Sequence, residues 1–161
     1  MKRELWLVRH GRTDWNHERR FQGRIDHVLN SEGRREAEAL VPILRNQTFE
    51  RVWSSQRRRS LETARLAFGE PTVDTRLDEF DFGEIEGMTW SDLASDMQER
   101  LLGFETFVAP GGESVVDFRR RIEDFVAGLG GGRHLIFTHG GVIRILTGIT
   151  PDPGQHLVIH L

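Results

Sequence analysis

Two histidines in this chain follow short apolar runs and are themselves followed by glycine. They lie in the segments Leu7-Val8-Arg9-His10-Gly11 and Phe137-Thr138-His139-Gly140-Gly141. Apolar runs this short suit strands, and glycine permits the turn that ends a strand. Because ligands bind at the carboxyl ends of strands in open α/β sheets, both imidazoles are candidates for one site. His10 fits a nucleophile, and the Arg9 guanidinium beside it fits an anion clamp.

Two further segments carry charged groups that suit chemistry on an anion. Residues 54–59 read Ser-Ser-Gln-Arg-Arg-Arg and lie at a predicted strand-to-helix junction, where free N–H groups and the helix dipole favour an anion. Residues 77–87 hold several carboxylates among phenylalanine, isoleucine and glycine. A carboxyl group in such surroundings can act as a general acid. Spacing alone does not separate Glu79 from Glu84 and Glu86 in that role.

Each segment also has a less specific interpretation. Arg9 and His10 can be a basic pair on a solvated strand edge, and His139 can be a hydrogen-bonded structural histidine. The arginines of residues 54–59 can be solvated side chains at a helix start, and residues 77–87 can be an acidic loop. Taken singly, none of these segments identifies a function.

The elements around these residues alternate between strands and helices. Strands are predicted at 4–8, 51–54, 72–73, 134–138 and 156–161. A first helix is predicted from an N-cap at Ser31, with a break at Pro42. A second is predicted from Ser55 to Gly69, with Leu61, Ala64 and Phe68 facing inward. Three more are predicted from an N-cap at Thr89 to Met97, from an N-cap at Ser114, and after Gly141. Alternation of this kind predicts an α/β fold, a three-layer α/β/α sandwich around a mostly parallel central sheet.

The composition limits the classes of partner and of chemistry. The chain has 161 residues, a net charge of −3 and no cysteine. This length predicts a single domain over residues 1–161, and the negative charge argues against a nucleic-acid partner. Without cysteine there is no disulfide, thiolate chemistry or Cys-ligated metal. No stretch reaches membrane-spanning length and no secretory signal is visible, so we expect no membrane contact and a cytoplasmic location.

Taken together, the motifs resemble those of the histidine phosphatase superfamily, on its phosphoglycerate-mutase-like branch. The matching segments are Leu7–Thr13, Trp15-Asn16, Gln22-Gly23, Ser54-Ser55 with Arg59–Ala64, Leu77-Asp78-Glu79 with Phe82-Gly83 and Glu86-Gly87, Pro110–Ser114 and Thr138–Arg144. They occur in the family's order across nearly the whole chain. The short segment after the acid motif and the Pro-Gly-Gly-Glu-Ser motif look like those of α-ribazole phosphatases and broad-specificity phosphatases.

The resemblance implies a role for each matching residue. His10 would become phosphorylated, Arg9, Arg59 and His139 would hold the phosphoryl oxygens, and Glu79 would donate the proton to the leaving group. The residues Asn16, Gln22, Gly23 and Gly140 would contact the phosphate or the rest of the substrate. No metal and no cofactor are expected. The implied substrate is a small phosphorylated molecule, and the oligomeric state is left open.

Three functions stay open at this point. The preferred one is a metal-independent phosphatase for a small phosphomonoester, and the alternatives are a phosphoglycerate mutase and a phospho-ligand binding module without turnover. Mutases of the family carry a longer insertion after the acid motif than residues 88–109 provide. Arg12 and Arg57 depart from the family pattern and could alter substrate preference. Trp90, just after the acid motif, is a candidate for the wall of the substrate pocket.

Overall fold

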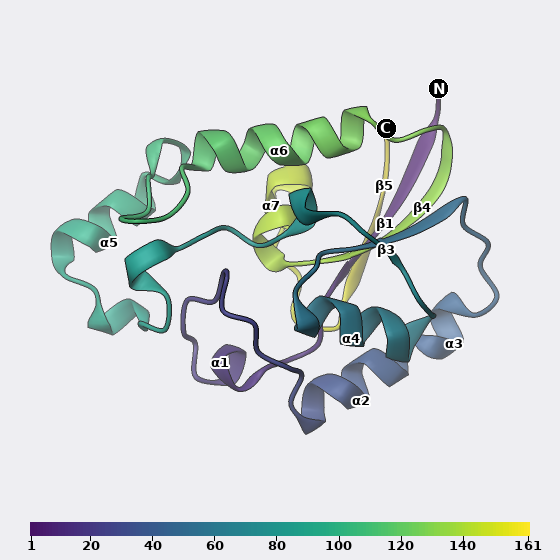
Figure 1. The fold of residues 1–161 in the computed structure, drawn as a ribbon, viewed down its shortest axis with the longest axis horizontal. Helices are drawn as coiled ribbons and strands as arrows, with labels where there is room; N and C mark the ends of the chain where they lie inside the picture. The colour runs from purple at the N-terminus through teal and green to yellow at the C-terminus, as the bar shows by residue number, and fades with distance from the viewer.

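The computed structural model describes residues 1–161, whose five strands form one sheet in the order β3-β2-β4-β1-β5 (Figure 1). The strands are β1 (Arg3–Arg9), β2 (Arg51–Ser54), β3 (Thr72–Val73), β4 (Gly132–Thr138) and β5 (His156–His160). The first four run parallel, and β5 pairs antiparallel with β1. The predicted mostly parallel sheet is therefore confirmed.

Helices cover both faces of the sheet (Figure 1). They are α1 (Asp14–His17), α2 (Ser31–Ala39), α3 (Val41–Leu44), α4 (Arg58–Ala67), α5 (Ser95–Leu102), α6 (Val115–Ala127) and α7 (Gly140–Thr147). Helices α6 and α7 pack on one face, α3 and α4 pack on the other, and α2 packs against α4. Helix α5 lies at one end of the molecule, away from the strands (Figure 1). None of these helices has the combined length and apolar character needed to cross a membrane.

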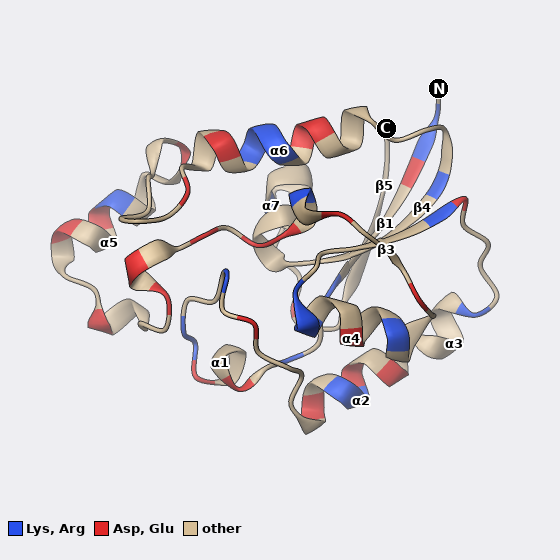
Figure 2. Cartoon of the chain, viewed as in Figure 1, with Lys and Arg blue, Asp and Glu red and all other residues tan.

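Side-chain alternation along the central strands explains the two helical layers. Successive residues of a strand point to opposite faces of a sheet. Leu5 and Leu7 join the core cluster under α6 and α7, whereas Val8 joins the cluster under α3 and α4. Figure 2 marks positions of both charge signs along α2, α4 and α6. Each of these helices presents charged residues to solvent, and α4 and α6 also pack apolar residues against the sheet.

Two predicted helix starts differ from the structure. The N-cap of α2 is Asn30, whose side chain accepts a hydrogen bond from the Gly33 N–H, and Ser31 is the first helical residue. Helix α4 begins at Arg58 rather than Ser55. The Ser55 N–H still donates to the Phe137 carbonyl, which extends the strand pairing, and the Gln56 N–H donates to Asp78. These long-range hydrogen bonds keep residues 55 and 56 out of the helix, so α4 starts later than the local sequence predicts.

Two other predictions about helices are wrong. The helix predicted from Thr89 to Met97 is a 3₁₀ turn, Trp90–Asp92, followed by α5 from Ser95. Leu93 between them is extended and buried, so burial of this side chain interrupts the helix. Phe68 is 40% exposed and does not face the core, because α4 ends at Ala67. The predicted break at Pro42 is confirmed, since α2 ends before it and α3 begins anew.

Gly33, near the start of α2, packs so closely against the backbone of residues 11–12 that no side chain would fit at position 33. A Cβ atom on Gly33 would lie 2.1 Å from the Arg12 carbonyl oxygen. We expect Gly33→Ala to destabilise the fold by about 1–3 kcal/mol through overpacking, which exceeds the gain of up to about 1 kcal/mol in helix propensity. Urea unfolding measures the change.

Gly128 provides the matched control. It has right-handed helical backbone angles, φ −80° and ψ −8°, and a Cβ atom added there would lie no closer than 3.5 Å to the neighbouring carbonyl oxygens. Gly128→Ala should therefore leave stability unchanged or raise it slightly. A Gly33→Ala variant as stable as Gly128→Ala would contradict the close packing of α2 against residues 11–12.

Candidate active site

The pairing of β1 with β4 brings the two histidines together. In the parallel register Arg9 lies opposite Thr138, and the His10 N–H donates to the Thr138 carbonyl at 3.0 Å. His10 and His139 each follow that pair by one residue. Their ring centroids are 5.1 Å apart with the ring planes at 63°, and both side chains are buried. The prediction that they meet at one edge of the sheet is confirmed.

A backbone carbonyl selects the tautomer of His10. Its Nδ1 lies 2.7 Å from the Gly11 carbonyl oxygen. Since a carbonyl oxygen only accepts hydrogen bonds, Nδ1 carries the proton. In the neutral ring Nε2 then has a free lone pair. The Gly11 N–H donates to Thr63 Oγ1 of α4, which keeps this carbonyl in place.

A serine and an aspartate select the tautomer of His139. Ser55 Oγ donates to Asp78 Oδ1 at 2.7 Å and lies 2.8 Å from His139 Nε2. Because the serine gives its only hydrogen to Asp78, His139 Nε2 must donate to the serine oxygen. His139 Nδ1 is buried and has no partner. It therefore holds a lone pair in the neutral ring and a proton only when the ring is charged.

Arg59 is fully buried at the first turn of α4. Its guanidinium donates to the carbonyls of Gly23 at 2.8 Å and Ile25 at 2.7 Å. Glu86 Oε1 accepts from the N–H groups of the same two residues, at 3.0 and 2.9 Å. Burial lowers the pKa of the Arg59 guanidinium to about 10. Residues 23–25 are thus held between a buried cation and a carboxylate, which assigns Glu86 a structural role.

Arg9 faces the site from the end of β1. Its Nη1 donates to the Pro151 carbonyl at 2.7 Å, and burial lowers its pKa. A Cβ atom on Gly140 would lie 3.1 Å from the Arg9 Cζ, so only glycine gives the guanidinium this much room. The Nε atoms of Arg9 and Arg59 are buried without a partner, as is His139 Nδ1. Three nitrogen atoms in this cluster therefore have unused hydrogen-bonding capacity.

Glu79 lies beside the start of α7. Its carboxylate accepts from the Gly141 N–H at 3.1 Å and from the Phe80 N–H at 2.8 Å. Its negative charge acts favourably on both Arg9 and Arg59, which places it near the two guanidiniums. Of the three carboxylates that spacing left open, Glu79 is the one that contacts the residues following His139.

The backbone of the acid segment is held by Arg121 of α6. All five N–H groups of this guanidinium are used: they donate to the carbonyls of Arg76, Asp78 and Glu79 and to both carboxylate oxygens of Glu113, at 2.7–3.0 Å. This planar fork fixes the segment that carries Glu79. Sequence reasoning missed Arg121, because nothing in its own helix distinguishes it from neighbouring surface arginines.

The other predicted substrate contacts, Asn16, Gln22, Gly23 and Gly140, lie around the histidine and arginine side chains of the site. Asn16 Oδ1 accepts from the Thr13 N–H at 3.0 Å and Gln22 Oε1 accepts from Thr13 Oγ1 at 2.9 Å, so both side chains lie one hydrogen bond from the loop that follows His10. Asn16 also caps α1. Gly23 contacts Arg59 and Gly140 contacts Arg9, each through close backbone approach.

The two arginines that depart from the family pattern are both paired. Arg12 Nη1 lies 3.2 Å from Glu32 and 3.1 Å from Glu36, on α2. Arg57 Nη2 lies 3.3 Å from Asp78. Neither guanidinium is therefore an isolated positive charge at the site, and Arg57 instead pairs with the aspartate that orients Ser55.

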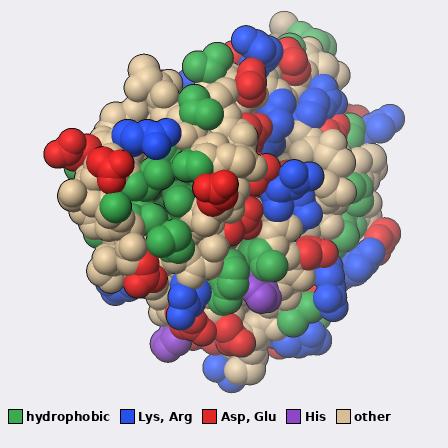
Figure 3. All heavy atoms as spheres, turned by 60° about the vertical axis from the view of Figure 1, so that its left-hand side comes forward, with side chains coloured by type: hydrophobic (Ala, Val, Ile, Leu, Met, Phe, Trp, Pro, Cys, Tyr) green, Lys and Arg blue, Asp and Glu red, His purple; other side chains and the backbone are tan.

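A pocket opens beside Glu79 and Gly141. It has a volume of about 390 Å³, and 8 of its 12 lining residues are hydrophobic, Trp90 among them. Figure 3, in which the α5 end of the molecule comes forward, shows hydrophobic side chains gathered between charged ones. The predicted wall position of Trp90 agrees with this pocket. No group of three or more histidine, aspartate or glutamate side chains is arranged to hold a metal ion.

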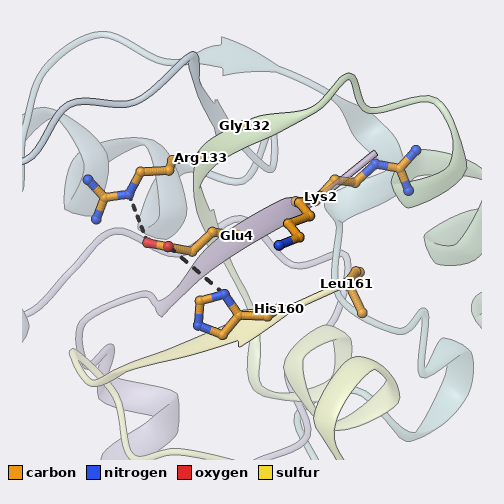
Figure 4. A pocket seen from close by; sticks show the side chains of 7 residues that line it. Lys2, Glu4, Gly132, Arg133, His160 and Leu161 are labelled. Carbon is orange, nitrogen blue, oxygen red and sulfur yellow. Dashed lines mark hydrogen bonds and ion pairs between the residues drawn. The ribbon is translucent and has the colours of Figure 1, made fainter.

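Another hollow lies at the opposite end of β1 and β4 (Figure 4). There Glu4 lies between Arg133, at 2.8 Å, and His160, at 3.9 Å. Lys2 and Gly132 belong to the strand ends at which β1 and β4 begin, whereas His10 and His139 follow the ends at which they finish. This hollow is therefore separate from the histidine site.

Both site imidazoles make stability depend on pH. Burial, together with nearby guanidiniums, lowers the pKa of His10 and of His139 well below 6.5. As pH falls below 6.5, the unfolded chain binds protons that the folded rings do not bind, so the free energy of unfolding should decrease. The expected slope is at most about 1.4 kcal/mol per pH unit for each ring. Urea unfolding on both sides of pH 6.5 measures it.

Replacing the rings tests their part in that slope. We expect His10→Asn and His139→Asn each to remove part of the pH dependence. His160→Asn, at a side chain that is 73% exposed, is the matched control and should retain the slope. Equal slopes in all three variants would contradict the assignment.

Comparison with known proteins agrees with this geometry. Residues 5–155 match the model of the histidine phosphatase superfamily (branch 1). The glucosyl-3-phosphoglycerate phosphatase of Mycobacterium tuberculosis is 34% identical over 165 residues, covering 90% of this chain and 74% of that protein. The phosphoglycerate mutase structure from Thermus thermophilus has a TM-score of 0.90 and 38% identity, covering 97% of this chain and 92% of that one. An Escherichia coli structure described as a candidate α-ribazole-5′-P phosphatase has a TM-score of 0.86 and 25% identity, covering 98% and 89% of the two chains. The chain therefore belongs to branch 1 of the histidine phosphatase superfamily.

Proposed function

We propose that this protein is a metal-independent phosphatase that hydrolyses a small phosphomonoester through a phosphohistidine at His10. The observation that carries the proposal is the set of buried nitrogen atoms without partners on Arg9, Arg59 and His139. Buried polar atoms are costly when unpaired, so they indicate a missing hydrogen-bonding group. A phosphoryl group supplies three acceptor oxygens and the negative charge that two guanidiniums favour.

In the first step the phosphoryl group passes from the substrate oxygen to His10 Nε2. The Gly11 carbonyl holds the proton on Nδ1, so Nε2 presents its lone pair to phosphorus. Negative charge spreads over the three equatorial oxygens of the transition state, where fixed positive groups stabilise it. For this step Glu79 must carry a proton when the substrate is bound; as the P–O bond breaks, it gives that proton to the leaving oxygen, and the alcohol departs neutral.

In the second step water attacks the phosphohistidine. Glu79, now a carboxylate, takes a proton from the water as its oxygen bonds to phosphorus. The P–N bond breaks, and its electron pair returns to His10 Nε2. Inorganic phosphate leaves, and both His10 and Glu79 return to their starting protonation states.

His139 would bind the phosphoryl group as an imidazolium. Its Nε2 already donates to Ser55, so Nδ1 can donate to a phosphoryl oxygen only after the ring gains a proton. Burial keeps the pKa of this ring low without an anion. Entry of the phosphate dianion would therefore be coupled to proton uptake. The Asn16 and Gln22 side chains and the backbone at Gly23 and Gly140 would complete the contacts with substrate.

A phosphoglycerate mutase is the second candidate, favoured by the 38% identity to the Thermus thermophilus enzyme. A mutase must keep water from its phosphohistidine. Residues 88–109 supply only one α-helix, the eight-residue α5, and none of its side chains is buried. So little cover favours hydrolysis over transfer between two positions of a substrate.

A phosphate-release assay in the presence of EDTA tests the function. The panel contains p-nitrophenyl phosphate, 3-phosphoglycerate, nucleotides and sugar phosphates. We expect release that resists EDTA and falls at least about 10⁴-fold in His10→Ala, because the nucleophile is removed. His160→Ala, which removes an exposed histidine, should retain the activity of the unmodified protein.

Three results would contradict the proposal. Release that requires a metal would exclude the metal-independent mechanism, and release that survives in His10→Ala would exclude this nucleophile. Interconversion of 2- and 3-phosphoglycerate without phosphate release would instead establish the mutase.

A further inference from the structure

The pocket beside Glu79 has a lining that the phosphoryl-transfer chemistry does not require. Its walls come from separate parts of the chain, through Phe21, Phe82, Trp90, Leu101 and Phe104. Trp90 is 44% exposed although it faces this hollow. Aromatic side chains exposed in a concave site are typical of ligand pockets rather than of a folded core.

The pocket borders the proposed phosphate site. Glu79 and Gly141 both line it, and the Gly141 N–H donates to the Glu79 carboxylate. Gly141 is the second residue after His139. If Glu79 protonates the leaving oxygen, the carbon atoms attached to that oxygen extend toward this pocket. The inference therefore rests on the proposed function.

The walls are held in place before any ligand binds. The rings of Phe21 and Phe82 lie 5.2 Å apart, and those of Phe80 and Phe82 lie 5.0 Å apart in an edge-to-face arrangement. The Phe21 N–H donates to the Met88 carbonyl, and Gln98 of α5 donates to the Trp90 carbonyl at 2.9 Å. A preformed aromatic wall accepts a flat apolar group with little loss of side-chain entropy.

The same pocket offers little to a hydroxylated leaving group. Apart from Glu79, its polar side chains are those of Arg144 and Thr150. The Arg144 guanidinium lies over the Phe104 ring at 5.2 Å, where it adds a face for stacking. Hydroxyl groups placed among these phenylalanines would lose water without gaining hydrogen bonds.

A polar hollow borders Glu79 as well, and it is the competing location for the leaving group. It is lined by Arg24, Arg57 and Arg121, but these cations already pair with Asp81, Asp78 and Glu113 respectively. A polar substrate would compete with these ion pairs for the three guanidiniums. No ion pair of this kind joins the residues that line the aromatic pocket.

We propose that this pocket selects phosphomonoesters whose alcohol carries a flat apolar group, such as an aromatic ring two or three bonds from the ester oxygen. The ring lies between Trp90 and Phe104, and the phosphoryl group reaches His10. Small hydroxylated phosphates bind only through the phosphoryl group. The substrate class is thus an aromatic or large apolar phosphate ester rather than a phosphoglycerate or a sugar phosphate.

The test compares 2-phenylethyl phosphate with 2-hydroxyethyl phosphate, which share a primary alkyl leaving group. We expect kcat/KM to be at least about 30-fold higher for the phenylethyl ester, mainly through KM, as hydrophobic discrimination of this kind allows. Trp90→Ala should lose most of this preference, and Trp90→Phe should keep part of it. Phe68→Ala, an exposed aromatic on the other side of the sheet, is the control and should retain the full preference. Urea unfolding confirms that each variant folds.

The outcomes distinguish failure of the pocket assignment from failure of the proposed phosphatase function. A ratio near one, a preference for the hydroxyethyl ester, or an unchanged ratio in a folded Trp90→Ala variant would overturn the pocket assignment and leave the phosphatase intact. If neither ester nor p-nitrophenyl phosphate is hydrolysed by the unmodified protein, the proposed function fails and this inference fails with it.

Discussion

Burial of positive charge is the constraint on which the rest of the site depends. Arg59 is completely buried, and burial lowers its pKa to about 10, so the folded chain keeps a guanidinium where water would stabilise it better. Its compensation in the free protein is a pair of backbone carbonyls and the more distant charge of Glu79. The same charge, with burial, keeps His10 and His139 neutral. An anion that enters this cluster meets donors that need little rearrangement.

The fold places this cluster through three independent connections. The parallel register of β1 and β4 sets the two histidines side by side. The first turn of α4 supplies Arg59 and, through Thr63, the same helix holds the Gly11 backbone. Helix α6 holds the acid segment through Arg121, so Glu79 is fixed from the opposite face of the sheet. A site assembled from both helical layers is rigid because each layer is anchored by its own part of the core.

The sequence predicted the parts of the site that are local and missed those that depend on packing. His10 and His139 were found because each sits at the end of an apolar run before glycine, a signal contained in a few residues. Ser55 and Asp78 lie in segments that match the family but have no role assigned from the sequence, and Arg121 is not singled out at all, because hydrogen bonds that span 20 or more positions leave no local pattern. The start of α4 was misplaced for the same reason, since Ser55 bonds to Phe137 instead of beginning the helix. Two glycines mark close contacts that only the structure identifies: Gly33 against the Arg12 backbone and Gly140 against the Arg9 guanidinium.

The central claim is that His10 carries the phosphoryl group between substrate and water. The most direct measurement is rapid quenching of the protein during turnover of a radiolabelled phosphomonoester, followed by peptide mapping. The account predicts a phosphoryl group on the peptide that contains His10, stable in alkali and lost in acid, which forms and decays fast enough to account for turnover. Steady turnover with no phosphorylated protein, or with the label on a different residue, would contradict it.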